Sequence, residues 1–179
     1  MTQIGTVYAQ GLYALAKEEQ LEGKILEELE YLQNIFAQET GYIALLASPN
    51  LSKEERTGLL DEAFRGKLQP YLLNFLKLLT EKGYIRHFSD CCKTYRSLYN
   101  DAHGILSVRA VSAVALTEEQ QHKLTEKLST ITGKQILLET KLDPSCLGGI
   151  RLDYDGKRVD GTVAGRLESM ANLLKNASI

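Results

Sequence analysis

The sequence predicts a multidomain protein of the α and α/β classes, with an N-terminal six-helix bundle followed by a small mixed α/β domain. Up to Gly104, apolar residues recur at spacings of three and four, the period of amphipathic helices. From Ile105 they alternate with polar residues, the period of strands. The chain has 179 residues, enough for two small domains. We therefore expect a helical domain over residues 1–104 and an α/β domain over residues 105–179.

The first two helices are marked by apolar faces. One face predicts a helix from about residue 4 to 18, and its members are Ile4, Val7, Tyr8, Gly11, Leu12 and Leu15. The next repeats the pattern with Leu21, Ile25, Leu29, Leu32 and Phe36. Glutamates between these positions are expected to face water.

Four further helices complete the predicted bundle. A short one over residues 42–47 ends before Pro49, and Ser52 with Glu55 forms a capping box that opens the next. Pro70 suits the first turn of a fifth helix, which is apolar on more than one face. A long helix over residues 85–102 follows Gly83 and ends at Gly104.

The second domain is predicted from alternating strands. Residues 105–113 and 135–142 read as strands, joined by a helix that a capping box at Thr117 and Gln120 opens. A strand, a crossover helix and a strand in this order normally run parallel. The helix is expected to bury Leu124, Leu128 and Ile131, and to end at Gly133.

The last segment is rich in aspartate and glycine, residue types that are common in turns. Asp143-Pro144-Ser145 is turn chemistry, residues 150–154 alternate as a strand, and Asp155-Gly156 is a favoured hairpin turn. Asp160 or Thr162 then caps a last helix. Its core face would hold Val163, Leu167, Met170, Ala171 and Leu174.

A metal or phosphate site in this segment is not expected. Asp153 and Asp155 lie on the strand face opposite the apolar one and share it with Arg151, so they are expected to be solvated. Gly148-Gly149 precedes a strand, whereas a phosphate loop opens a helix. We predict no metal and no cofactor.

Catalytic groups are equally hard to find. The three histidines, His87, His103 and His122, have no serine, cysteine or carboxylate partner at a recognisable catalytic spacing. The cysteines match neither a disulfide framework nor a zinc spacing and are expected to be buried free thiols. An enzyme that uses Asp143, Asp153 and Asp160 is therefore only the third hypothesis.

Composition excludes other classes. Hydrophobic residues make up 44% of the chain, charged residues 25%, and the formal net charge is -2, so a strongly basic nucleic-acid surface is not expected. The longest apolar run, residues 42–47, is far short of the ~20 residues that span a bilayer. No basic region precedes an apolar block at the N-terminus, so no secretory signal is expected.

Two helices carry more apolar surface than one buried face needs. In the first helix Ala9, Tyr13 and Ala16 extend the stripe, and in the fifth Tyr71, Phe75 and Leu78 do so. Either both helices are central in the bundle, or they border a groove for a partner's helix. Periodicity alone leaves these two interpretations open.

Several stretches together resemble the delta subunit of bacterial F-type ATP synthases, the counterpart of the mitochondrial oligomycin-sensitivity-conferring protein. The resemblance covers essentially the whole chain, and each stretch alone is weak, whereas their order and spacing are specific. The stretches are YAQGLYAL at 8–15, LLASP at 45–49, NFLKLL at 74–79 with EKG at 81–83, VSA at 111–113 with LTEEQ at 116–120, and DPSCLGGI at 143–150 with VDGTVAGRL at 159–167.

The resemblance implies a stator subunit without catalytic activity, bound as a peripheral membrane protein on the cytoplasmic face of the bacterial cell membrane. Its helical domain would bind the N-terminal helix of an alpha subunit, and its second domain the b subunits of the peripheral stalk. It implies no nucleic-acid partner, and contact with the membrane only through the complex. Carried over by position, the groove would be lined by Tyr8, Ala9, Leu12, Tyr13, Tyr71, Phe75 and Leu78.

The stalk contact is placed on the last helix, with Leu167, Met170 and Leu174. Gly11 lies in mid-helix, where glycine costs about 1 kcal/mol relative to alanine, and it would permit a close helix approach. The alternative hypothesis is a helical bundle with an α/β module that binds nucleic acid or a nucleotide. The lack of basic clusters and of adjacent strand aromatics argues against that alternative.

Overall fold

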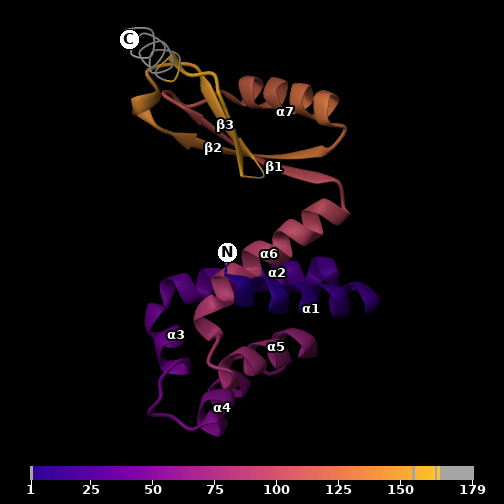
Figure 1. Cartoon of the computed structure of the whole chain (residues 1–179), viewed down its shortest axis with the longest axis vertical. Helices are drawn as coiled ribbons and strands as arrows, with labels where there is room; N and C mark the ends of the chain where they lie inside the picture. Colours follow the sequence, from indigo (N-terminus) through magenta and orange to yellow (C-terminus); the bar gives the residue numbers. More distant parts are fainter. Residues whose placement is uncertain (1, 155, 164, 166–179) are drawn as a thin grey trace, which may run out of the picture. The chain divides into compact units, whose positions relative to one another are not determined.

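The computed structural model describes residues 2–154, 156–163 and 165, which form seven α-helices and one four-stranded mixed sheet. Internal contacts divide the chain into two compact units, residues 1–99 and 100–179 (Figure 1). The first unit is helical, and the second contains the sheet. Over the described residues, none of the helices has the length and apolar character of a membrane span.

The first two helices follow the predicted faces. Helix α1 spans Gln3–Glu18 and α2 spans Glu22–Gln38. The Thr2 side chain caps α1, because its hydroxyl accepts a hydrogen bond from the backbone N–H of Gly5. The side chains of α2 that face the core are Ile25, Leu29, Leu32 and Phe36, as the spacing predicts.

Four more helices follow in the first unit: α3 (Thr40–Leu46), α4 (Lys53–Phe64), α5 (Pro70–Glu81) and α6 (Phe88–Ala102). Both halves of the predicted capping box of α4 are present, since Ser52 and Glu55 each accept from the other's backbone N–H. The predicted helix over 85–102 begins later. Its first residues form the 3-10 turn η1 (Ile85–His87).

The core of the first unit is a layer of leucine and aromatic side chains. Phe36 packs edge-on against Phe88, with ring centroids 5.1 Å apart, and edge-on against Phe64 at 6.3 Å. Tyr95 is fully buried, and its hydroxyl donates to the carbonyl of Glu22 at 3.0 Å. Each fully buried leucine or phenylalanine contributes about 1.5–3 kcal/mol relative to an exposed one, so this layer holds the helices together.

The second unit is a sheet with strand order β2-β1-β3-β4. Strands β1 (Ile105–Ser112) and β2 (Gln135–Leu142) run parallel and are joined by α7 (Glu118–Thr132), as predicted. The 3-10 turn η2 (Pro144–Cys146) leads to β3 (Ile150–Tyr154), which pairs antiparallel with β1 and with β4 (Lys157–Asp160). The predicted turn residue Asp155 lies outside the described residues.

One face of the sheet carries apolar side chains and packs against a helix. Helix α7 covers one face of the sheet (Figure 1). On β1, Leu106, Val108 and Ala110 share one face and are buried. Leu124 and Leu128 of α7 are half-buried, but Ile131, which the pattern predicts in the core, is exposed. Ile131 therefore lies off the stripe of α7 that packs on the sheet.

Candidate partner-binding groove

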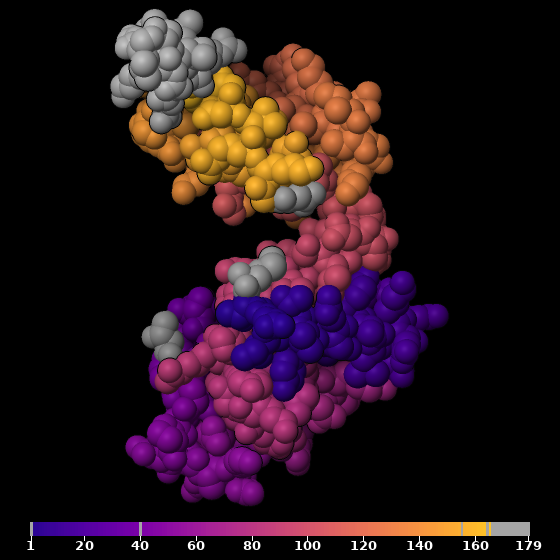
Figure 2. Space-filling view, viewed as in Figure 1, coloured from indigo at the N-terminus to yellow at the C-terminus, as the bar shows by residue number. Residues whose placement is uncertain are grey.

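An apolar groove runs between α1 and α5 on the surface of the first unit. Its volume is about 400 Å³. Figure 2 shows α1, in indigo, on the surface of this unit. The lining residues are Val7, Tyr8, Gly11, Leu12 and Leu15 from α1, and Tyr71, Asn74, Phe75 and Leu78 from α5.

Small residues hold α1 against the helices behind it. Ala9 and Ala16 are wholly buried, and a Cβ atom at Gly5 would lie only 2.8 Å from Cβ of Asp90 on α6. The carboxylate of Asp90 also accepts from the backbone N–H of Thr2 at 3.0 Å. These contacts fix the start of α1 with its small residues against the neighbouring helices. The larger apolar residues lie on the other side of α1 and form the groove wall.

The groove has a buried floor and an exposed rim. Leu12 and Phe75 form the floor, with 5% and 7% of their surface exposed. Val7 and Leu78 form the rim, with 59% and 42% exposed. No other atom of the described residues lies within 4 Å of a Cβ built at Gly11, so the wall is open to a partner at that point. The groove therefore presents apolar side chains to solvent.

The wall on the side of α5 is tied to the end of α1. The Glu19 carboxylate beside Tyr71 raises the pKa of the tyrosine, first through its charge and then through burial and a hydrogen bond. Tyr8 packs edge-on against Tyr84, with ring centroids 5.8 Å apart. These contacts hold the two tyrosines of the groove in fixed positions.

The structure brings together five of the predicted groove residues and separates two. Tyr8, Leu12, Tyr71, Phe75 and Leu78 line the groove. Ala9 and Tyr13 do not, because they lie on the opposite side of α1. Ala9 is wholly buried, and Tyr13 packs edge-on against the buried Tyr95 at 5.3 Å.

Sequence reasoning does not assign Val7, Gly11, Leu15 and Asn74 to the groove. The first three belong to the face with spacings of three and four that predicts the helix, and such a face is normally core. The predicted stalk residues Leu167, Met170 and Leu174 lie outside the described residues.

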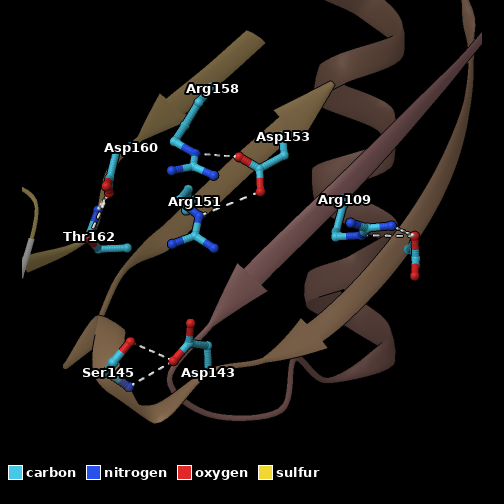
Figure 3. Close-up of polar contacts among 9 residues, drawn as sticks. Arg109, Asp143, Ser145, Arg151, Asp153, Arg158, Asp160 and Thr162 are labelled. Carbon is cyan, nitrogen blue, oxygen red and sulfur yellow. Dashed lines mark hydrogen bonds and ion pairs between the residues drawn. The ribbon is translucent and has the colours of Figure 1, made fainter. Parts of the chain in front are cut away.

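The aspartates near the end of the chain surround an arginine. Figure 3 shows Arg151 between the side chains of Asp143 and Asp153, near the turn that holds Asp160. Asp153 binds Arg158 at 2.8 Å and Arg151 at 3.6 Å. The hydrogen bond from Arg158, followed by the charges of both arginines, lowers the pKa of Asp153.

The other two aspartates that the structure describes in this segment close turns. Asp143 accepts from the backbone N–H of Ser145 at 3.0 Å, and Asp160 accepts from that of Thr162 at 2.9 Å. The hydroxyls of Ser145 and Thr162 bond to the same carboxylates, and these bonds, followed by those from the backbone N–H groups, lower the pKa values of both aspartates. Among the described residues, no three histidine, cysteine, aspartate or glutamate side chains converge as metal ligands do. The carboxylate oxygens instead accept hydrogen bonds from backbone N–H groups and form ion pairs with the arginines.

The cysteines are buried free thiols, as predicted. Burial raises the pKa of Cys91 to about 11 and that of Cys92 to about 12. Both thiols therefore stay protonated at neutral pH, and a protonated thiol is a poor nucleophile. Their part in the molecule is packing.

Comparison with known proteins identifies the family. Residues 4–174 match the family described as ATP synthase delta (OSCP) subunit. The ATP synthase subunit delta of Geobacillus sp. (strain WCH70) is 33% identical over 168 residues, covering 93% of this chain and 94% of the relative. That of Alkaliphilus oremlandii (strain OhILAs) is 30% identical over 167 residues, covering 93% of each chain.

A solved structure shares the fold. One chain of the Toxoplasma gondii mitochondrial ATP synthase hexamer superposes with a TM-score of 0.80 at 19% identity, over 97% of this chain and 98% of its own. Because the family match spans nearly the whole sequence, this chain belongs to the ATP synthase delta (OSCP) subunit family, whose members are non-catalytic stator components of F-type ATP synthase.

Proposed function

We propose that this chain links the catalytic head of F-type ATP synthase to the peripheral stalk through two separate contacts. The groove between α1 and α5 takes the N-terminal helix of an alpha subunit. The second domain, residues 105–179, holds the b subunits. In this role the chain resists the torque that the rotor exerts on the head, at the cytoplasmic face of the bacterial membrane.

The exposed rim of the groove is the observation that carries the proposal. Val7 and Leu78 stand on facing walls and remain exposed, at 59% and 42%, above a buried floor. Exposed apolar side chains around a concave surface are typical of a docking site for an amphipathic helix, which inserts residues at spacings of three and four. The helix would bury the rim, at about 25 cal/mol per Å² of apolar surface before association costs.

The open position at Gly11 supports the same occupant. A glycine on an exposed helix face costs about 1 kcal/mol relative to alanine, and no described residue of this unit uses the space beside it. A partner helix that crosses α1 at Gly11 would approach its backbone closely. We propose that α1–α6 act as one six-helix bundle over residues 1–104, which holds the two walls at a fixed separation.

The stalk contact remains on the last helix in this proposal. Leu167, Met170 and Leu174 recur at spacings of three and four in the sequence, and these positions form one apolar stripe on a helix. The b subunits would pack on that stripe. The assignment rests on the sequence pattern and the family.

Substitution at the rim tests the groove. Leu78→Asp and Val7→Asp should each weaken binding of a synthetic alpha-subunit N-terminal helix by about 30-fold, the loss of about 2 kcal/mol expected when a charged group is buried against an apolar helix face. Isothermal titration calorimetry with the full chain gives the affinity. Circular dichroism should show unchanged helix content, since neither side chain is buried in the core.

Leu45→Asp is the matched control. Leu45 has the same residue type and the same 42% exposure as Leu78 but lies on α3, outside the groove. It should leave the affinity unchanged. Equal weakening by all three variants would overturn the assignment, as would normal binding by both rim variants. Phe75→Asp is unsuitable, because Phe75 is only 7% exposed and its replacement would also destabilise the fold.

The competing hypothesis is a nucleic-acid or nucleotide module, and the relatives do not favour it. Pull-down with the full chain from membranes washed at low and high salt distinguishes the two. Recovery of ATP synthase head and stalk subunits supports the stator role. Recovery of nucleic acid without those subunits would contradict it.

A further inference from the structure

Strand β2 forms a long, open edge of the sheet in the second unit. It pairs with β1 on one side, and no described strand lies on its other side. Every residue from Glu139 to Leu142 is exposed, and 57% of the Leu142 surface is open to solvent. An edge of this kind offers unpaired backbone groups to another strand.

The direction of the backbone groups follows from the two ends of β2. The N–H of Gln135 donates to Gly104 at 2.9 Å, and the N–H of Asp143 donates to Ser112 at 2.8 Å. Both bonds point toward β1. Since successive residues of a strand point to opposite sides, the backbone groups of the odd-numbered residues of β2 face β1. The outward N–H and C=O groups therefore belong to Ile136, Leu138, Thr140 and Leu142.

One end of this edge is less accessible than the other. Helix α7 borders Gln135 and Ile136, where the two elements line a polar hollow, and Ser129 of α7 donates to the carbonyl of Lys134 at 2.9 Å. Beyond the other end, Pro144 has no N–H to donate. The open part of the edge therefore runs from Leu138 to Leu142.

The charges on this part of the edge are self-complementary. If two copies pair antiparallel about a two-fold axis at Thr140, Glu139 lies opposite Lys141 of the other copy, and this pair occurs twice. Leu138 lies opposite Leu142, which would cover the exposed leucine. A two-fold axis at Glu139 would instead place two glutamates face to face, which is unfavourable.

Glu139 keeps its partner within the chain in this register. Its Oε2 atom binds Arg109 on the neighbouring strand β1 at 3.0 Å, and its other carboxylate oxygen can accept from the lysine of the second copy. Because both groups of the pair with Arg109 are more than half exposed, that pair contributes little to folding, and a charge change at residue 139 should leave the sheet intact.

We propose that the free chain forms a weak antiparallel dimer through β2, centred on Thr140, with the second copy as the occupant of this edge. The contact is isologous, so the same strand supplies both halves. Charged residues normally discourage pairing at an edge, but here their order matches one partner and one register. Only five residues of each strand take part, so we expect a dissociation constant of about 0.1 to 1 mM, in the range of small, transient contacts.

Sedimentation velocity on the full chain, up to about 1 mM protein at near-physiological salt, measures the dimer. The weight-average mass of the wild type should rise toward that of a dimer with concentration. Thr140→Pro removes the outward N–H at the centre and no bond to β1, so it should stay monomeric at every concentration. Thr140→Val is its matched control and should dimerise like the wild type.

Charge exchange tests the register. Lys141→Glu alone and Glu139→Lys alone place like charges opposite each other and should both stay monomeric. A mixture of the two variants restores both opposite-charge pairs, since each of the two acidic positions on one chain then faces a basic position on the other. The mixture should therefore dimerise.

A wild type that stays monomeric at about 1 mM overturns the proposal, because the proposed dissociation constant is at most about 1 mM. Dimerisation of Thr140→Pro at the wild-type level also overturns it, and loss of that dimer in Leu78→Asp would place the contact at the groove instead. A mixture that remains monomeric while the wild type dimerises would rule out the register centred on Thr140.

Discussion

Gly149 joins the loop before β3 to the segment that follows β4. Its backbone has φ of +79°, and a Cβ atom there would lie 2.5 Å from the carbonyl oxygen of Gly161. Two hydrogen bonds clasp the segments, from the Gly161 N–H to Ile150 at 3.1 Å and from the Val163 N–H to Gly148 at 3.0 Å. Only glycine combines this φ with so close an approach of two backbones.

Gly149→Ala is therefore expected to destabilise the second unit by about 2–4 kcal/mol, because the strained φ and the contact with Gly161 add. Gly133→Ala is the matched control. Gly133 also has a positive φ, +66°, but a Cβ there would meet nothing within 4 Å in the described residues. It should cost only about 1 kcal/mol. Urea unfolding followed through the amide NMR signals of β1 measures both losses, and equal losses would contradict the role of the close approach.

At the scale of an element, α1 shows what the sequence could and could not predict. Its period follows from the pattern of apolar residues, which predicts a helix from about residue 4 to 18, and the observed helix spans Gln3–Glu18. Which side faces the core does not. Gly5, Ala9 and Ala16 are buried, whereas the larger Val7 is exposed, because small residues let α1 approach α6 closely. Valine is more hydrophobic than alanine, so a prediction from hydrophobicity alone places the residues of the groove wall in the core.

The strands of the second unit follow their sequence pattern more closely, since alternation determines which residues share a face. The parallel pairing of β1 with β2 follows from the crossover helix, and β2 spans the predicted residues 135–142. The role of Arg151 is not predictable in this way. No periodicity indicates that Asp143, after β2, and Asp160, at the end of β4, approach one arginine on β3.

The charged face of β3 and β4 should make the stability of the second unit depend on pH. The folded pKa values of Asp153 and Asp160 lie below the ordinary value of about 3.9. Their contribution is therefore complete above about pH 4 and is lost as the pH falls through the folded values. Asp153→Asn should be less stable than the wild type at pH 7, and the gap should narrow as the pH falls below about 4.

Urea unfolding of both proteins across this range measures the gap. Comparison with Asp153→Asn is needed because Asp61 and Asp90 of the first unit also have lowered pKa values. They titrate equally in both proteins and cancel in the difference. A gap that is constant or that widens toward acid would show that Asp153 contributes nothing through its charge.

For the whole molecule, the change of period at residue 104 and the family resemblance indicate the two-part organisation. Internal contacts place the division between residues 99 and 100, so the last turn of α6 belongs with the sheet. A helical pattern does not change along α6, and the sequence therefore gives no sign of where contacts pass from one unit to the other. The buried cluster of the first unit contains no described residue beyond Tyr95.

Because the two units have separate hydrophobic cores, we expect them to unfold independently. Leu76 is wholly buried in the first unit, and Leu76→Ala should cost that unit about 2–5 kcal/mol through lost burial and the remaining cavity. Hydrogen exchange of the full chain should show faster exchange in α5, by a factor that corresponds to this loss, while the amides of β1 keep the wild-type rate. Val108→Ala, wholly buried on β1, is the reciprocal control and should speed exchange in the sheet alone. If either variant accelerated both units equally, the chain would unfold as one cooperative body, and a stator with two independently stable contacts would need a different structural basis.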